Sequence, residues 1–178
     1  MKPKCRIKIT LACNRNCPYC INKSKEYSDK WIKVKAISDI PLRDYRTVII
    51  SGGEPTRSNL LYSHLCNIKA GVDNNTPIYL QTNGYRLTKS LVKSLDNMID
   101  GIGLSIHDVE EFGHLYTRYK DIARIKPIRL YVEDKIIWNK ESTSALFLSN
   151  LLVKDIFSFK VWKDGEFDPT EHIYVLEK

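Results

Sequence analysis

Three of the five cysteines in this chain lie within a stretch of eight residues, CNRNCPYC. Cys13, Cys17 and Cys20 follow the spacing C-x3-C-x2-C, and no fourth cysteine lies nearby. If their thiolates bind a 4Fe-4S cluster, one iron lacks a protein ligand and can bind an exchangeable molecule, whereas a fully ligated cluster normally only transfers electrons. We therefore predict an iron-sulfur site with one open iron, at which the three sulfurs converge.

Two other metal sites compete with this interpretation. Zinc accepts three sulfurs and one nitrogen, so Cys66, Cys5 or a histidine could complete a structural zinc site. Such sites usually show paired C-x2-C knuckles, and only Cys17 and Cys20 form one here. A bacterial ferredoxin needs the spacing C-x2-C-x2-C and a fourth cysteine. The spacing therefore favours the cluster with an open iron.

The segment SGGEPT, residues 51–56, is the second group that could bind a ligand. Gly52 and Gly53 permit positive φ and a close approach of the backbone, and Glu54 adds a carboxylate. Backbone carbonyls and one acid would form a cradle for an ammonium group. Taken alone, the same residues are typical of a tight turn between a strand and a helix.

Short apolar runs alternate with segments of helical period, which is typical of βα units around a parallel sheet. The predicted strands are Cys5–Thr10, Thr47–Ser51, Ile78–Thr82, Gly101–Ile106, Ile128–Val132 and Ile156–Trp162. Six parallel strands cannot close an eight-stranded barrel. We therefore predict an α/β fold, a partial, open TIM-like barrel of about six parallel βα units, with residues 1–178 as one domain. Ligands of such sheets gather at the carboxyl ends of the strands.

The helices between these strands are predicted from the spacing of apolar residues. Ser58–Ala70 is followed by Gly71, which would cap it, and Leu87–Met98 begins beside Thr88, a favourable N-cap residue. Cys66 lies at helical spacing within Ser58–Ala70 and is expected to be a buried small side chain. Two more helices are expected at residues 108–124 and 142–154.

Two parts of the chain fit the βα pattern poorly. Residues 22–46 are strongly polar, so we expect a loop or a short helix there instead of a full crossover helix. The tail, residues 163–178, passes through Gly165 and Pro169. It offers His172–Leu176 as an extra edge strand or a terminal extension.

The combination of motifs resembles the radical S-adenosylmethionine (radical SAM) superfamily. CNRNCPYC follows the first predicted strand, GGEP follows the second and QTNG follows the third. These motifs and strands follow one another in the order that the superfamily shows, from Cys5 to about Val132. The superfamily has a full or partial barrel of βα units, which agrees with the strand count. The resemblance implies that residues 11–22 form the loop that holds the 4Fe-4S cluster.

The resemblance also implies roles for the residues of the first two motifs. The three cysteines would ligate three irons, and the fourth iron would bind the amine and the carboxylate of S-adenosylmethionine. Gly52, Gly53 and Glu54 would hold the methionine ammonium. Tyr19 would pack near the adenine. Alternatively, Tyr19 is a core residue beneath the loop.

Six further candidates lie at the ends of the third, fourth and fifth strands, namely Thr82, Asn83, Ser105, His107, Val132 and Glu133. In this superfamily the first four positions often reach the ribose or the carboxylate of the cofactor. Thr82 and Asn83 fit a simple turn before Gly84 equally well. His107 is also a candidate for a catalytic proton donor or acceptor, or it could cap the next helix. The fifth strand lacks the glycines of the family's adenine-binding strand. Val132 and Glu133 therefore remain as its candidates for contact with the adenine.

The activity that the resemblance implies is reductive cleavage of S-adenosylmethionine to methionine and a 5'-deoxyadenosyl radical, which abstracts hydrogen from a substrate. An electron donor such as flavodoxin or ferredoxin would supply the electron. The substrate class stays open between a glycine of another protein, as for the glycyl-radical activases, a deazapurine precursor, and a nucleotide or nucleic acid. No general acid or base is needed at this step, because the cofactor carries the hard chemistry.

The composition agrees with an intracellular enzyme without selecting its substrate. With 28 Lys and Arg against 21 Asp and Glu, the net charge of +7 would attract an anionic substrate or an acidic protein partner. The scattered lysines serve solubility equally well. No apolar run is long enough to cross a bilayer and no signal peptide is recognisable, so we expect a cytoplasmic protein. The alternative that is not an enzyme is a zinc-stabilised, basic nucleic-acid-binding module.

Overall fold

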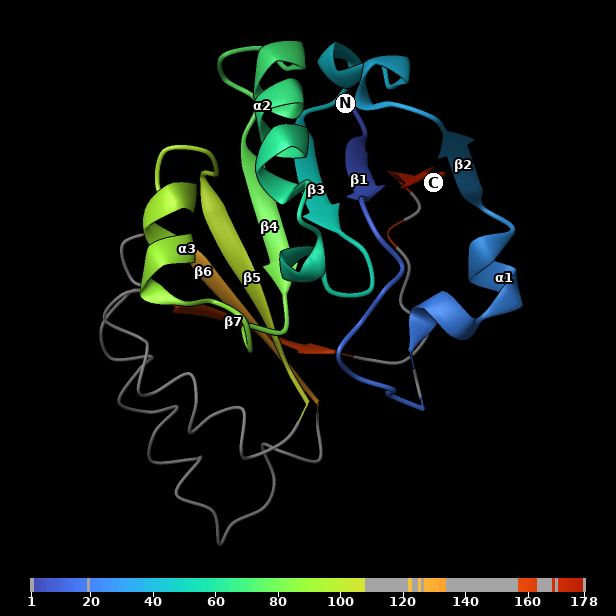
Figure 1. Ribbon diagram of the computed structural model, residues 1–178. Coiled ribbons are helices and arrows are strands. Elements are labelled where there is room, and N and C mark those ends of the chain that lie inside the picture. Colours follow the sequence, from blue (N-terminus) through green and yellow to red (C-terminus); the bar gives the residue numbers. More distant parts are fainter. Residues whose placement is uncertain are drawn as a thin grey trace, which may run out of the picture. The chain divides into compact units, whose positions relative to one another are not determined.

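The computed structural model describes residues 2–18, 20–107, 122, 125, 127–133, 157–162, 168 and 170–177. By its internal contacts the chain divides into two compact units. The first consists of residues 1–80 with 167–178, and the second of residues 81–166. Figure 1 shows the described helices and strands of both units. Whether the chain behaves as one domain, as expected, stays a prediction.

The first unit holds parallel strands in the order β2-β8-β1-β3-β4, and the last two residues of β4 belong to the second unit. Their bounds are Lys4–Lys8 for β1, Trp31–Val34 for β2, Thr47–Ser51 for β3, Ile78–Thr82 for β4 and Glu171–Leu176 for β8. Cys5 lies opposite Val48 on one side and His172 on the other. The register aligns the carboxyl ends of β1 and β3, so the segments that follow these two strands begin side by side.

The core of the first unit is apolar on one face of this sheet. Ile7, Ile50 and Leu80 lie opposite one another in β1, β3 and β4, so their side chains point to the same face, and all three are fully buried. Helix α2 (Leu61–Gly71) buries three side chains at helical spacing, Leu61, Leu65 and Ile68. It packs against the 3-10 helices η2 (Ile37–Asp39) and η3 (Leu42–Asp44) and, at its start, against η4 (Pro55–Arg57).

The second unit contains three parallel strands in the order β5 (Gly101–Ile106), β6 (Ile128–Glu133) and β7 (Phe157–Trp162). Helix α3 (Lys89–Leu95) begins after Thr88, whose hydroxyl oxygen accepts a hydrogen bond from the Leu91 N–H over 3.2 Å. The predicted cap is therefore confirmed. Val92 and Leu95 are the buried side chains of α3.

The prediction of an α/β fold with parallel strands is confirmed. Strands β3, β4 and β5 have the predicted bounds, and β1, β6 and β7 differ from prediction by one or two residues. The helix predicted at residues 142–154, and that at 108–124 except for Ile122, lie outside the described residues. Within the described part of the chain, no helix is long and apolar enough to cross a membrane.

The first connection and the tail differ from expectation. Residues 22–46 contain the expected short helix, α1 (Lys25–Ser28), preceded by the 3-10 helix η1 (Ile21–Lys23). They also contain β2, which was not predicted because its four residues are too few for a clear alternation. β8 is a strand as proposed, but the prediction of an edge strand is wrong, since β8 lies between β1 and β2.

Two expectations about α2 are also wrong. Gly71 is the last residue of the helix and not the residue after it, because Val72 holds the C-cap position. Cys66 is exposed, whereas we expected it to be buried. It lies between the buried Leu65 and the exposed Asn67, on the side of the helix that faces away from the core.

Candidate functional site

The three clustered cysteines lie on the loop between β1 and η1, directly after the carboxyl end of a parallel strand. All three are free thiols that are partly exposed. Burial raises the pKa of the Cys13 thiol, while the Arg15 N–H, which donates to Cys13 Sγ over 3.4 Å, opposes this rise. The loop thus has the location predicted for a ligand site in a parallel sheet.

Within the described residues, no three His, Cys, Asp or Glu side chains form a group that could hold one metal ion. Cys5 is buried in β1 and Cys66 is exposed on α2, so the zinc alternative gains no support from either. A 4Fe-4S cluster needs a different arrangement, because each of its thiolates binds a different iron. The three cysteine sulfurs therefore do not form a site for a single metal ion. Their convergence on a 4Fe-4S cluster stays a prediction.

The GGE turn, Gly52 to Glu54 after β3, is bound to the start of the cysteine loop by two backbone hydrogen bonds. The Gly53 N–H donates to the Thr10 carbonyl over 2.7 Å, and the Glu54 N–H donates to the Ala12 carbonyl over 2.9 Å. A Cβ on Gly53 would lie 2.5 Å from the Ala12 carbonyl oxygen, and one on Gly52 would collide with the Thr10 carbonyl. Both glycines are therefore required by the close approach of two backbones.

The polar groups of the GGE turn are not equivalent. The Gly52 carbonyl accepts a hydrogen bond from Asn22 Nδ2 over 3.0 Å, whereas the Gly53 carbonyl has no partner among the described residues. Glu54 is 1% exposed, and its Oε1 accepts from the Thr56 N–H over 3.0 Å and the Thr56 hydroxyl over 2.5 Å. The turn therefore presents one open carbonyl next to a buried acid.

Two exposed cations, which the sequence analysis missed, hold the backbone of the cysteine loop. Arg57 Nη1 donates to the Cys13 carbonyl over 2.6 Å. Lys23 Nζ donates to the Cys17 carbonyl over 2.8 Å and to Asn16 Oδ1 over 2.7 Å. No motif marks either residue, since Arg57 comes from the end of η4 and only the fold brings it to the loop.

The candidates of the second unit form local turn contacts. Thr82 Oγ1 accepts from the Gly84 N–H and Asn83 Oδ1 accepts from the Tyr85 N–H, each over 3.1 Å, and Gly84 has φ of +76°. The turn that we considered as the alternative for Thr82 and Asn83 is thus present. Gln81 Nε2 lies 3.5 Å from Ser105 Oγ as a donor. The cofactor roles of Thr82, Asn83 and Ser105 therefore stay predictions.

The remaining predicted site residues are His107, Val132, Glu133 and Tyr19. His107 follows β5 directly and is partly exposed. Val132 and Glu133 lie in β6, but their side chains, like all of Tyr19, are outside what the structure describes. Their predicted roles stay predictions.

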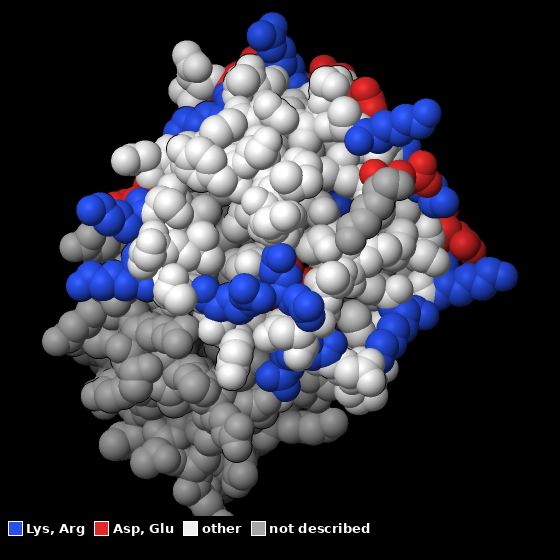
Figure 2. Space-filling view, in the orientation of Figure 1, with Lys and Arg blue, Asp and Glu red and all other residues white. Residues whose placement is uncertain are grey.

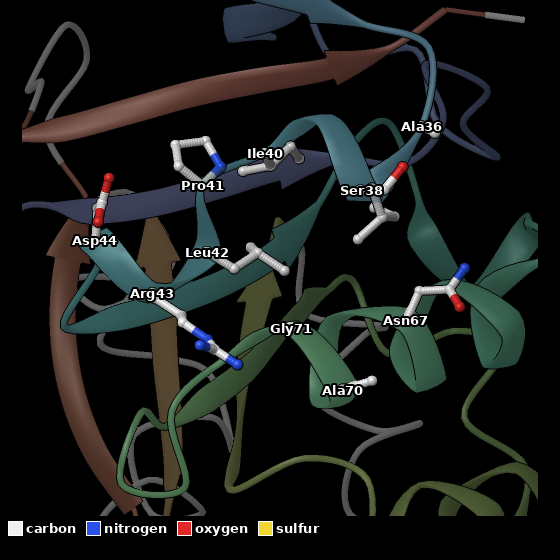
Figure 3. Close-up of a pocket in the computed structure, with 11 residues that line it drawn as sticks. Ala36, Ser38, Ile40, Pro41, Leu42, Arg43, Asp44, Asn67, Ala70 and Gly71 are labelled. Atoms are coloured by element: carbon white, nitrogen blue, oxygen red, sulfur yellow. The ribbon is translucent and has the colours of Figure 1, made fainter.

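A pocket of about 690 Å³ lies in the first unit, between residues 36–44 and the second half of α2. Figure 3 shows its lining, with Leu42 next to Gly71 and with Arg43 and Asn67 at its sides. None of the site residues predicted from the sequence lines this pocket. It is therefore separate from the cysteine loop and the GGE turn.

The family model of the Radical SAM superfamily matches residues 7–133, which include the cysteine loop, the GGE turn and β1 to β6 except the start of β1. The chain belongs to the radical SAM superfamily. Membership implies an iron-sulfur cluster and S-adenosylmethionine as cofactors. The donor set fits, because one loop bound to the sheet carries three free thiols, one for each of three irons.

This radical SAM chain is similar to one curated protein and to several solved structures. The protein named "Probable GTP 3',8-cyclase" from Sulfolobus acidocaldarius is 28% identical over 110 residues, which cover 59% of this chain and 34% of that protein. Streptococcus suis SuiB matches with a TM-score of 0.61 and 17% identity, over 95% of this chain and 41% of SuiB. The structure of anSMEcpe with bound AdoMet matches with a TM-score of 0.60 and 18% identity, over 93% of this chain and 53% of that one.

These likenesses support the fold more than the activity. At such identities the solved structures show the fold alone, and they agree with a partial TIM-like barrel. The radical SAM chain spans about a third of the curated relative and about half of the two solved chains.

Proposed function

We propose that this protein is an enzyme that cleaves S-adenosylmethionine reductively at a 4Fe-4S cluster and uses the resulting 5'-deoxyadenosyl radical to abstract hydrogen from a substrate. The observation that carries the proposal is the direct attachment of the cysteine loop to the GGE turn through Thr10 and Ala12. Three thiols for a cluster and acceptors for an ammonium group are thereby held within one hydrogen-bonded unit. Superfamily membership supports the same reaction.

Each residue of the site has a defined task in this proposal. Cys13, Cys17 and Cys20 would hold the cluster with one thiolate on each of three irons, which leaves the fourth iron for the cofactor. The methionine ammonium would donate to the Gly53 carbonyl, which is the open acceptor of the GGE turn. The buried carboxylate of Glu54 would attract the same ammonium, because charges interact more strongly away from water. Glu54 thus selects a cationic group at this position.

The relative named "Probable GTP 3',8-cyclase" favours the nucleotide-modifying class over the glycyl-radical activases and the deazapurine-precursor enzymes. The net charge of +7 suits an anionic substrate, and Figure 2 shows Lys and Arg side chains at several places across the visible face. The reaction also needs an electron donor, such as a flavodoxin or a ferredoxin. We expect it to proceed in the cytoplasm, where thiols stay reduced.

Anaerobic reconstitution tests the central reaction. Wild-type protein should bind about four iron atoms per chain. After reduction with dithionite it should convert S-adenosylmethionine to 5'-deoxyadenosine. Cys17→Ala should abolish the product, whereas Cys66→Ala, which removes an exposed thiol outside the loop, should leave it unchanged. Absence of 5'-deoxyadenosine from the wild-type reaction, or its persistence in Cys17→Ala, would contradict the proposal.

The substrate class is tested with the same assay. Adding GTP, and in parallel ATP and a short RNA, should increase the rate of 5'-deoxyadenosine formation if a nucleotide or nucleic acid is the substrate. Rates that no nucleotide or RNA alters would exclude this class.

A further inference from the structure

Lys8, the last residue of β1, is buried, whereas most of the other described lysines are exposed. Its side chain is 2% exposed. Its ammonium group lies 4.7 Å from the ring centroids of Tyr27 and Trp31 and donates a hydrogen bond to Asn22 Oδ1. Among the described residues no carboxylate forms an ion pair with it. Burial of an ammonium without a carboxylate costs free energy, so its contacts require an explanation.

The two rings that surround Lys8 come from the first connection, residues 22–46. Tyr27 lies in α1 and Trp31 begins β2, and the two rings meet edge to face with centroids 6.1 Å apart. Aromatic faces stabilise a desolvated ammonium group. Burial and then Arg6 lower the pKa of Lys8 to about 7, while Cys20 opposes this shift.

Asn22, which lies two residues after Cys20, connects Lys8 with the GGE turn. Its Oδ1 accepts from Lys8, and its Nδ2 donates to the Gly52 carbonyl over 3.0 Å. In its ammonium form Lys8 can only donate hydrogen bonds, so it holds the oxygen of the Asn22 amide on its own side. The amide NH₂ group must then face Gly52. Lys8 thereby orients the bond between the end of the cysteine loop and the turn.

Both ends of the cysteine loop are consequently attached to one turn. Gly53 and Glu54 bind its start through Thr10 and Ala12, and Gly52 binds its end through Asn22. The Asn22 bond also occupies the Gly52 carbonyl, which leaves the Gly53 carbonyl as the acceptor for a ligand.

We propose that Lys8 is a positioning residue of the cofactor site, which orients Asn22 and so holds the cysteine loop and the GGE turn in the geometry that binds S-adenosylmethionine. This inference rests on the proposed function. Removing Lys8 leaves the three thiols unchanged, so the cluster should still assemble. The affinity for S-adenosylmethionine should fall instead, because the loop and the turn are no longer held together at the loop's end.

Two variants and one control test this role in reconstituted full-length protein. Lys8→Met removes the ammonium at nearly constant length. Asn22→Asp keeps an acceptor for Lys8 but cannot donate to the Gly52 carbonyl, so it breaks the connection and leaves Lys8 and its aromatic contacts in place. Lys33→Met is the control, because Lys33 is an exposed lysine of β2. The measurements are iron content, the dissociation constant of S-adenosylmethionine, and the electron paramagnetic resonance spectrum of the reduced cluster with and without it.

Both variants should bind the same amount of iron as wild type, bind S-adenosylmethionine about tenfold more weakly, and show a reduced spectral change on its addition. Lys33→Met should match wild type. If Lys8→Met does not fold, Asn22→Asp alone decides. Wild-type affinity and spectra in Asn22→Asp would overturn the role of Lys8 and leave the proposed function intact. A wild-type protein that binds neither cluster nor S-adenosylmethionine would overturn both.

Discussion

Arg57 donates a hydrogen bond to the main-chain carbonyl of Cys13 over 2.6 Å, although the two residues lie 44 positions apart in the sequence. Lys23, the last residue of η1, likewise donates a hydrogen bond to the Cys17 carbonyl over 2.8 Å. Each of these exposed cations thus restrains the backbone of a cysteine while its thiol stays available. The conformation of the cysteine loop therefore depends on Arg57 and Lys23, which are not cluster ligands themselves.

Arg57→Ala should make the bound cluster more labile with little effect on the fold. The lost hydrogen bond is at the surface, so the free energy of unfolding of the apoprotein should fall by no more than about 1 kcal/mol. Loss of iron to a chelator should be about threefold faster than in wild type, which corresponds to a similarly small free energy. Arg43→Ala, at an exposed arginine of η3, is the control. Equal rates of iron loss in both variants would show that the Arg57 bond is unimportant.

Gly53→Ala should prevent assembly of the cluster. The new methyl group would lie 2.5 Å from the Ala12 carbonyl oxygen, and the backbone cannot swing aside as a side chain can. We expect the free energy of unfolding to fall by about 2 kcal/mol and iron incorporation to be lost. Gly71→Ala is the matched control, because its methyl group meets only the flexible end of Leu42 and alanine favours a helix. Denaturant titration and iron analysis of both variants check this difference.

Tyr45→Phe should destabilise the attachment of β8. The Tyr45 hydroxyl lies 2.9 Å from His172 Nδ1 and 2.7 Å from the Tyr174 hydroxyl, both in β8. Burial and the Tyr174 hydrogen bond raise the pKa of Tyr45, so it stays protonated and able to donate. Its removal leaves the buried Tyr174 hydroxyl with one partner fewer and should lower the free energy of unfolding by about 1–2 kcal/mol. Tyr62→Phe, at a tyrosine that is 55% exposed, should change it by less than about 0.5 kcal/mol.

Asp168→Asn should remove a part of the stability that depends on pH. The Lys4 ammonium donates to Asp168 Oδ2 over 2.6 Å, and Thr170 donates to Oδ1 from both its hydroxyl and its N–H, so the pKa of Asp168 lies below its usual range. Stabilisation by this carboxylate is complete above the unfolded pKa, about 3.9, and is lost as the pH falls toward the folded value. The side chains of the pair are 34% and 32% exposed, which limits the effect at pH 7 to about 1 kcal/mol.

Urea titrations of wild type and Asp168→Asn over the acid range provide the measurement. The difference in unfolding free energy between the two proteins should shrink as the pH falls from 5 to 2. A difference that is constant over this range would mean that the charge of Asp168 has no part in the effect.

The sequence alone was sufficient for features that depend on residues close together in the chain. The thiol spacing identified the loop, the runs of β-branched residues defined β3, β4 and β5, and Thr88 marked the start of α3. The glycines of the GGE turn were also recognisable, because close backbone approach excludes any other side chain there. Each of these is a short-range pattern, in which hydrogen bonding and sterics act between near neighbours.

Only the tertiary structure decided which distant residues meet. The sequence places Glu171 in the tail, but pairing with β1 brings it within 2.9 Å of Arg6 and puts β8 inside the sheet. Cys66 has the spacing of a buried residue, yet the face of α2 that meets the core leaves it exposed. The contact of Lys8 with Asn22 likewise spans 14 residues of irregular chain. Such contacts follow from strand order and helix orientation, which the whole core determines and no local pattern encodes.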